Sequence, residues 1–168
     1  MPDLLGDKVK HLRRRHGLTQ MDLARQVALT SHAHLSNIET GRRPPSLALV
    51  IQLANHFTVS TDYLLRDAIA PAEVDTHRVP PQQEPPPDLQ FFGDKLRFLR
   101  MQRNLSQSDL ARQMATVSQA YLSLLEAGRK EPSIEVVLQL ADRFGVTTDY
   151  LLRDTLPITG DSSSPCGM

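Results

Sequence analysis

The chain contains the stretch TQMDLARQVALTSHAHLSNIETG at residues 19–41 and repeats it as SQSDLARQMATVSQAYLSLLEAG at residues 106–128. In the first copy, Thr19 precedes an apolar segment with helical spacing, and Asp22 follows three residues later, which is the pattern of a capping box. Ser31 is a suitable N-cap for a second helix, which ends before Gly41. Each copy therefore predicts two short helices joined by a tight turn.

The duplication extends well beyond this stretch. Residues 4–67 align with residues 91–154 at a constant offset of 87 and without a gap, and 35 of the 64 positions are identical. Both copies end in the same seven residues, TDYLLRD. A period this long, present only twice, indicates a duplicated domain rather than a solenoid.

Composition sets the boundaries of the two blocks. Residues 68–90 have five prolines in their second half and few large apolar side chains, so they cannot build a core and are predicted to form a Pro-rich linker. Residues 155–168 are predicted to be a disordered tail on the same grounds. The predicted domains are therefore residues 1–67 and 91–154.

Each block is predicted to be all-α, with five short helices and no strand signal. Leu5, Val9 and Leu12 follow helical spacing before the repeated stretch. After it, Pro45 and Ser46 start a fourth helix with an apolar face, and TDYLL forms a last short turn. Each block is near the lower size limit for an independent core, so this closing turn should help to seal it.

Charge and cysteine content restrict the class of protein. The formal net charge is zero, but residues 1–67 carry nine Lys and Arg against six Asp and Glu. Residues 91–154 carry nine against eight. No run of 18 apolar residues or signal-peptide pattern is present, and Cys166 is the only cysteine, so a cytoplasmic protein without disulfides is expected.

The sequence shows no pattern of an enzyme or of a cofactor-binding protein. It has no phosphate-binding glycine loop and no nucleophile–base arrangement. His32 and His34 are two residues apart, and such side chains diverge on a helix, so no metal site is predicted. We therefore expect neither catalysis nor a cofactor or metal.

Two short helices joined by a tight turn have the geometry of a helix-turn-helix. The residues Gln20, Leu23-Ala24, Ser31, Leu35-Ser36, Glu39, Gly41-Arg42 and Pro45-Ser46, and their counterparts in the second copy, resemble the Cro and phage-repressor type of domain, called the XRE family. The resemblance covers both blocks entirely. It implies two lambda-repressor-like domains and a sequence-specific regulator, a repressor associated with the nucleoid, that binds double-stranded DNA. The turns ALT and ATV are one residue longer than the commonest pattern of the family.

The third helix of each block has an outer face suited to the major groove. Leu35 and Ile38 point toward the core, so small and amide side chains occupy the opposite face, where they can approach base edges. Asn37 can form two hydrogen bonds with adenine, whereas Leu124 at the equivalent position would contact a thymine methyl or weaken DNA contact. The predicted base-reading residues are His32, Ala33, Ser36 and Asn37 in the first block and Gln119, Ala120, Ser123 and Leu124 in the second.

Groups suited to phosphate surround this face, at the amino ends of the second and fourth helices and in the basic loop. The resemblance assigns phosphate contacts to Gln20, Arg42, Gln107 and Arg129. The full predicted set is Thr19, Gln20, Arg42, Arg43, Ser46, Ser106, Gln107, Arg129, Lys130 and Ser133. The resemblance also implies structural ion pairs, Arg13 with Glu39 and Arg100 with Glu126, which fix geometry.

Two alternatives remain open at this level. Either both blocks bind DNA, or one of them, more readily the second, is a protein-interaction or dimerisation module. The two blocks could pair within one chain as a pseudo-dimer, or the TDYLLRD helices could pair between chains as a homodimer with four reading heads. No feature of the sequence indicates a small-molecule effector.

Overall fold

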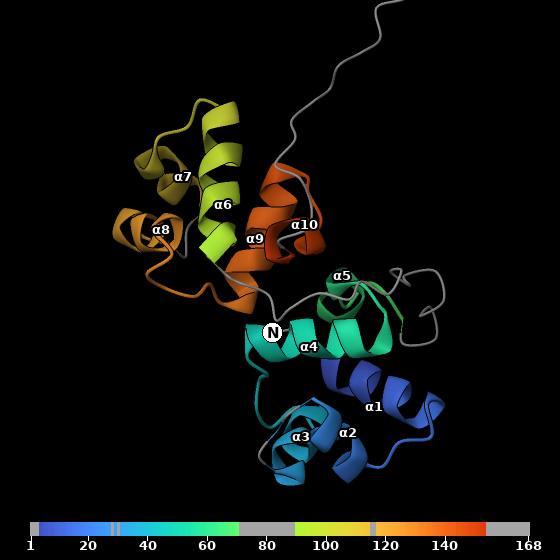
Figure 1. Cartoon of the computed structure of the whole chain (residues 1–168). Helices are drawn as coiled ribbons and strands as arrows, with labels where there is room; N and C mark the ends of the chain where they lie inside the picture. The colour runs from blue at the N-terminus through green and yellow to red at the C-terminus, as the bar shows by residue number, and fades with distance from the viewer. Residues whose placement is uncertain (1–3, 28, 30, 71–89, 115–116, 154–168) are drawn as a thin grey trace, which may run out of the picture.

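The computed structural model describes residues 4–27, 29, 31–70, 90–114 and 117–153, and the protein is all-helical over these residues (Figure 1). This confirms the predicted fold class. The first block contains α1 (Leu5–Arg15), α2 (Gln20–Gln26), α3 (His32–Glu39), α4 (Leu47–Phe57) and α5 (Thr61–Leu65). The second contains α6 (Gln90–Gln102), α7 (Gln107–Gln113), α8 (Gln119–Glu126), α9 (Ile134–Phe144) and α10 (Thr148–Leu152).

Several predicted segments lie wholly or partly outside the described residues. They are the tail, residues 71–89 of the linker, and residues 28, 30, 115 and 116 of the two turns between the helices of the motif. The first helix of the second block begins at Gln90, one residue before the predicted start of that domain.

The predicted helix starts are confirmed by their hydrogen bonds. Thr19 Oγ1 accepts from the Asp22 backbone N–H at 3.1 Å, and the Thr19 N–H donates to Asp22 Oδ2 at 3.0 Å. Ser106 and Asp109 form the same reciprocal capping box in α7. Ser31 Oγ accepts from the Ala33 backbone N–H at 3.1 Å and caps α3. Local sequence therefore fixes where the helices of the motif begin.

The motif helices pack on α1 through a close backbone approach that the periodicity analysis did not predict. A Cβ atom at Gly6 would lie 2.6 Å from the Ile38 carbonyl oxygen and 2.8 Å from that of Glu39. The repeat-equivalent Gly93 meets the carbonyl oxygen of Leu125 at 2.6 Å in the same way. Only glycine therefore lets the first turn of α1 or α6 approach the end of α3 or α8.

A second feature missed by the periodicity is a buried lysine on the apolar face of the first helix. Lys8 is fully buried, and its Nζ donates to the carbonyl oxygens of Tyr63 at 2.7 Å and Arg66 at 2.6 Å. Lys95 is buried at the equivalent position and donates to the carbonyl oxygen of Arg153. A cation at the carboxyl end of a helix satisfies terminal carbonyls and complements the helix dipole. These lysines therefore fix α5 and α10 to their own blocks.

The two blocks meet through their closing helices, which lie between the blocks in Figure 1. The Thr61 N–H donates to Asp149 Oδ2 at 2.9 Å, and the Thr148 N–H donates to Asp62 Oδ2 at 2.9 Å. The hydroxyls of Thr61 and Thr148 are 2.8 Å apart and fully buried. In this structure the TDYLL helices therefore pair within one chain.

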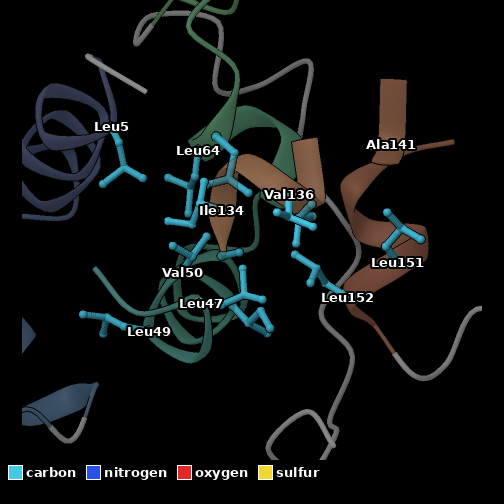
Figure 2. Packing of buried hydrophobic residues seen from close by; sticks show 14 of the residues in the cluster. Leu5, Leu47, Leu49, Val50, Leu64, Ile134, Val136, Ala141, Leu151 and Leu152 are labelled. Atoms are coloured by element: carbon cyan, nitrogen blue, oxygen red, sulfur yellow. The ribbon is translucent and has the colours of Figure 1, made fainter. Parts of the chain in front are cut away.

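Apolar side chains continue this contact on both sides (Figure 2). Leu64 and Val50 of the first block lie beside Ile134 of the second, and Val136 and Leu152 lie close to this group. Buried residues of both blocks belong to a single apolar cluster. Burial of apolar surface where the blocks meet favours the closed arrangement.

We expect Gly6→Ala to lower the free energy of unfolding by about 1–3 kcal/mol, because the added Cβ would overlap two backbone carbonyl oxygens. The higher helix propensity of alanine, about 1 kcal/mol, offsets only part of this cost. Urea denaturation of the full chain measures the change. Asp7→Ala, at the exposed neighbouring position, is the control and should stay within about 0.5 kcal/mol of the parent. Equal stability of Gly6→Ala and the parent would contradict the close approach.

Candidate nucleic-acid interface

The outer face of α3 consists of the residues expected there. His32 and Ala33 are exposed, and Ser36 and Asn37 are half-buried. The opposite face is buried through residues Leu35 and Ile38 together with Glu39. The structure thus presents a helix of small, amide and imidazole side chains to solvent, which is the size and chemistry that a major groove accepts.

The outer face of α8 differs in chemistry. Gln119, Ala120 and Ser123 are exposed and polar or small. Leu124 is 40% exposed and is one of three large apolar side chains exposed among the described residues. An exposed leucine at the position of Asn37 offers a methyl-contacting surface in place of a hydrogen-bonding amide. The two blocks therefore present different faces on the same scaffold.

A carboxylate at the end of α3 holds α1, α2 and α3 of the first block together. Arg13 Nε and Nη2 donate to the two oxygens of Glu39 at 2.6 and 3.0 Å. Arg13 Nη1 donates to the carbonyl oxygen of Leu18 at 2.9 Å, and Gln20 Nε2 donates to Glu39 Oε2 at 2.8 Å. The Glu39 side chain is only 3% exposed. Bidentate Arg–carboxylate geometry restrains orientation strongly, so α3 is fixed relative to α1 and α2.

The second block repeats this arrangement with Arg100, Gln107 and Glu126. Arg100 donates to the Glu126 oxygens at 2.7 and 3.0 Å, and Gln107 Nε2 donates at 2.8 Å. Burial by itself would raise the pKa of Glu126, but the hydrogen bonds from Arg100 and Gln107 outweigh it, so the pKa lies below its ordinary value. The hydrogen bond to Glu126 in turn raises the pKa of Arg100, so the pair stays ionised.

These contacts refine the roles expected of the residues that open the second helix. The Thr19 hydroxyl donates to Asp22 Oδ2 at 2.5 Å, and the Ser106 hydroxyl donates to Asp109 Oδ2 at 2.5 Å. Those protons serve the capping box, and a phosphate would need another donor from this turn. The amide of Gln20 has two N–H groups, of which one binds Glu39. The ion pair therefore orients the Gln20 amide at the end of α2.

The basic loop after α3 folds back on the end of that helix. The backbone N–H groups of Arg42 and Arg43 both donate to the Asn37 carbonyl oxygen, at 2.9 and 3.2 Å. Arg42, Arg43 and Ser46 are all exposed. Two guanidinium groups therefore lie in a loop anchored at the outer face of α3. The Ser46 hydroxyl caps α4 by accepting a backbone hydrogen bond.

The equivalent loop of the second block is held by an aromatic contact. Lys130 Nζ lies 4.9 Å from the centroid of the Tyr121 ring. Tyr121 occupies the position of His34, and its hydroxyl donates to the carbonyl oxygen of Glu131 at 3.3 Å. Arg129 and Ser133 remain exposed beside it. The Lys130 ammonium group thus makes a cation–π contact with Tyr121. Among the described residues, the equivalent Arg43 of the first block makes no such contact.

Other kinds of site receive no support from the described part of the chain. It contains no group of three or more His, Cys, Asp or Glu side chains that could hold a metal ion. None of its helices has the length and apolar character needed to cross a membrane.

Comparisons with known proteins agree with this geometry. Residues 4–66 match the helix-turn-helix domain family, and residues 96–151 match a second helix-turn-helix family. The chain therefore contains two helix-turn-helix domains in tandem, one in each block, which supports the resemblance to the XRE type of domain. No solved structure matches it significantly.

Three curated relatives illustrate the similarity. The HTH-type transcriptional regulator DdrOP3 of Deinococcus deserti is 44% identical over 59 residues, 35% of this chain and 45% of that protein. ImmR of Bacillus subtilis, also an HTH-type transcriptional regulator, is 38% identical over 61 residues, 36% of this chain and 47% of the relative. The SPbeta prophage-derived uncharacterized HTH-type transcriptional regulator YonR, also of B. subtilis, is 33% identical over 65 residues, 39% and 59% of the two chains. The chain thus spans about half the length of the relatives it matches.

We expect the Glu126 contacts to contribute stability that depends on pH. Because its pKa is lowered by folding, the contribution is complete above the ordinary value of 4.5 and is lost as the pH falls through the lowered value. Glu126→Gln should remove this component and cost about 3 kcal/mol at neutral pH, since it leaves Arg100 without its carboxylate. Urea denaturation of the parent and the variant between about pH 7 and pH 3, which includes the titration range of carboxylates, measures the pH dependence and the loss of stability.

The matched control is Glu131→Gln, which changes an exposed glutamate of the same block. Its pH dependence should follow that of the parent chain. A Glu126→Gln variant with the pH dependence of the parent would contradict the role of this carboxylate.

Proposed function

We propose that the protein is a sequence-specific regulator of transcription that binds double-stranded DNA and acts as a repressor. Helices α3 and α8 enter the major groove, one from each block. The observation that carries this proposal is the outer face of α3, which consists of small and amide side chains and is fixed by the Arg13–Glu39–Gln20 contacts. A rigid, hydrogen-bonding helix face is what direct readout of bases requires.

The proposed contacts divide into base and phosphate sets. Asn37 hydrogen-bonds an adenine through its amide, and His32 donates to a guanine acceptor. Arg42, Arg43 and the second N–H of Gln20 contact the phosphates on either side of the groove and set the register of α3. Repression then requires only occupancy of promoter DNA, and the protein works at the nucleoid in the cytoplasm.

A second candidate function is supported by the chemistry of the second block. Leu124 exposes an apolar surface where the first block has Asn37, and Lys130 is held over Tyr121. Both features suit a block that contributes less to DNA affinity and serves as a docking module. In that case α8 faces a protein partner, and α3 alone selects sequence.

We expect Asn37→Ala to weaken binding by about 1–3 kcal/mol and only at one base position, because it removes a bidentate base contact. Arg42→Ala should weaken binding to all sequences alike and reduce the slope of log affinity against log salt by about one unit. Binding titrations on a selected DNA site and on its single-base variants, at several salt concentrations, measure both. Unchanged affinity in both variants would rule out α3 as the reader.

We expect Gln119→Ala to weaken binding at a base pair different from the one that Asn37 reads. Random-pool selection with the full chain and with this variant tests it, and Gln139→Ala, which changes an exposed glutamine on α9, is the matched control. Loss of preference at one position of the selected motif supports DNA binding by α8. An unchanged motif favours the docking alternative for the second block.

A further inference from the structure

The contacts between the blocks are reciprocal. Thr61 donates its N–H to Asp149, and the repeat-equivalent Thr148 donates its N–H to Asp62. Thr148 is the repeat equivalent of Thr61, and Asp149 is that of Asp62, each at the offset of 87 that relates the two blocks in the sequence. The hydroxyls of Thr61 and Thr148 also touch each other, and a residue can contact its own equivalent only on a twofold axis. The interface is therefore a pseudo-twofold, isologous one.

Thr61, Thr148 and Asp149 are buried in this contact, Asp62 is half-buried, and the two helices satisfy each other's hydrogen-bonding groups. The first N–H groups of a helix have no partner within the helix. Here the Asp149 carboxylate satisfies the N–H of Thr61 at the start of α5, and Asp62 does the same for α10. Opening the interface would expose these N–H groups to water and separate apolar side chains of the two blocks that belong to one cluster. The closed pair is thus specified by both polar and apolar complementarity.

A twofold axis between the blocks also relates α3 to α8. A twofold rotation reverses every direction perpendicular to the axis. The two reading helices therefore point in opposite senses across the axis, as the recognition helices of a symmetric dimer do. In Figure 1 both helices lie in the outer parts of their blocks, away from α5 and α10. A direct repeat of half-sites would instead require the blocks to be related by a translation along the DNA.

We infer that the contact between α5 and α10 is a dimerisation surface closed within one chain. Consequently a single molecule reads two non-identical half-sites in inverted orientation at one fixed spacing. This inference rests on the proposed function of the blocks as DNA readers. The half-sites differ because Asn37 and Leu124 occupy equivalent positions on α3 and α8. Their centres are separated by about one helical turn, roughly 34 Å, as for other paired helix-turn-helix domains.

One ion pair across the interface favours the pairing of a first block with a second block over the pairing of two first blocks. Arg66 Nη1 lies 2.6 Å from Asp142 Oδ1 across the interface. The residue equivalent to Asp142 in the first block is Asn55, so two first blocks would lack this ion pair. Arg153 uses the other side of the interface to donate to the carbonyl oxygen of Val59 at 3.1 Å. The tether adds an effective concentration of around millimolar, so pairing within the chain prevails at ordinary concentrations.

The first experiment measures affinity of the full chain for duplexes that carry its two selected half-sites. The half-sites are placed in inverted or direct orientation, and the spacing is varied by about half a turn, five base pairs. We expect the inverted arrangement at one spacing to bind about 100-fold more tightly than the others, because only it engages both blocks. One chain per duplex is expected in sedimentation. Equal affinities for inverted and direct probes, or two chains per duplex, would overturn the inference.

A second experiment opens the interface. The double variant Asp62→Ala/Asp149→Ala removes both carboxylates that cap the partner helix, and the matched control Asp7→Ala/Asp94→Ala removes exposed carboxylates from α1 and α6. The open variant should keep its affinity for single half-sites but distinguish spacings by less than about threefold, since the linker then allows many arrangements. The control should retain the preference of the parent. A parental preference in the open variant would overturn the inference.

A third experiment tests the closed interface without the aspartate variant, which could lose its spacing preference by misfolding. Thr61→Cys/Thr148→Cys, made with Cys166→Ser, places two thiols where the hydroxyls are 2.8 Å apart. The oxidised, closed chain should bind the inverted site at least as tightly as the reduced one, and loss of binding on oxidation would overturn the inference.

The three experiments distinguish failure of the proposed function from failure of the inference. If the chain binds no duplex, including single half-sites, the proposed function itself fails. If it binds duplexes regardless of the orientation and spacing of the half-sites, only the inference about the interface fails.

Discussion

The buried carboxylate at the end of α3 and of α8 is the contact on which the rest of the structure depends. Glu39 and Glu126 each accept three hydrogen bonds from side chains, two from an arginine of the first helix and one from a glutamine of the second. Such a pair is stable only when all its hydrogen bonds are made, so it defines one arrangement of three helices. The glycine contact of α1 or α6 brings the backbones close enough for this arrangement. The outer face of α3 or α8 is rigid for that reason.

The contact between α5 and α10 applies the same principle between domains. The first N–H of each closing helix is satisfied by an aspartate of the other closing helix, and the hydroxyls of the equivalent residues Thr61 and Thr148 meet. Apolar side chains of both blocks belong to one cluster (Figure 2). The lysines beneath these helices connect the interface to α1 and α6, and through them to the carboxylates that hold α3 and α8. Helices α1 and α6 thus join the interface to the carboxylates that fix the outer faces of α3 and α8. Duplication followed by divergence at positions such as Asn37 and Leu124 changes the chemistry of the faces without altering this scaffold.

The helices could be predicted because their signals are local. Capping residues, apolar spacing and terminal glycines act over three to five positions, and the structure confirms the capping boxes at Thr19 and Ser106. The roles of Gly6 and Lys8 were not predicted, because neither residue fits the apolar pattern of its own helix. Each is explained by a contact with another helix, α3 for Gly6 and α5 for Lys8. Their signal was nevertheless present in the repeat. Both residues are unchanged at Gly93 and Lys95, as is the aspartate between them, although the two positions before and the three after this tripeptide differ.

The sequence by itself determined the two blocks, the five helices of each block and the faces that point outward, since these depend on local propensity and on amphipathic spacing. Only the tertiary structure determined which hydrogen-bond donors beside those faces are already bound within the protein. The Thr19 hydroxyl proton is directed to Asp22, and one N–H of Gln20 to Glu39, which is 19 positions away. The tertiary structure also decided that the TDYLL helices pair within the chain. Two identical segments are equally able to pair in cis or between chains, and in this structure Thr61 and Thr148 meet within one chain.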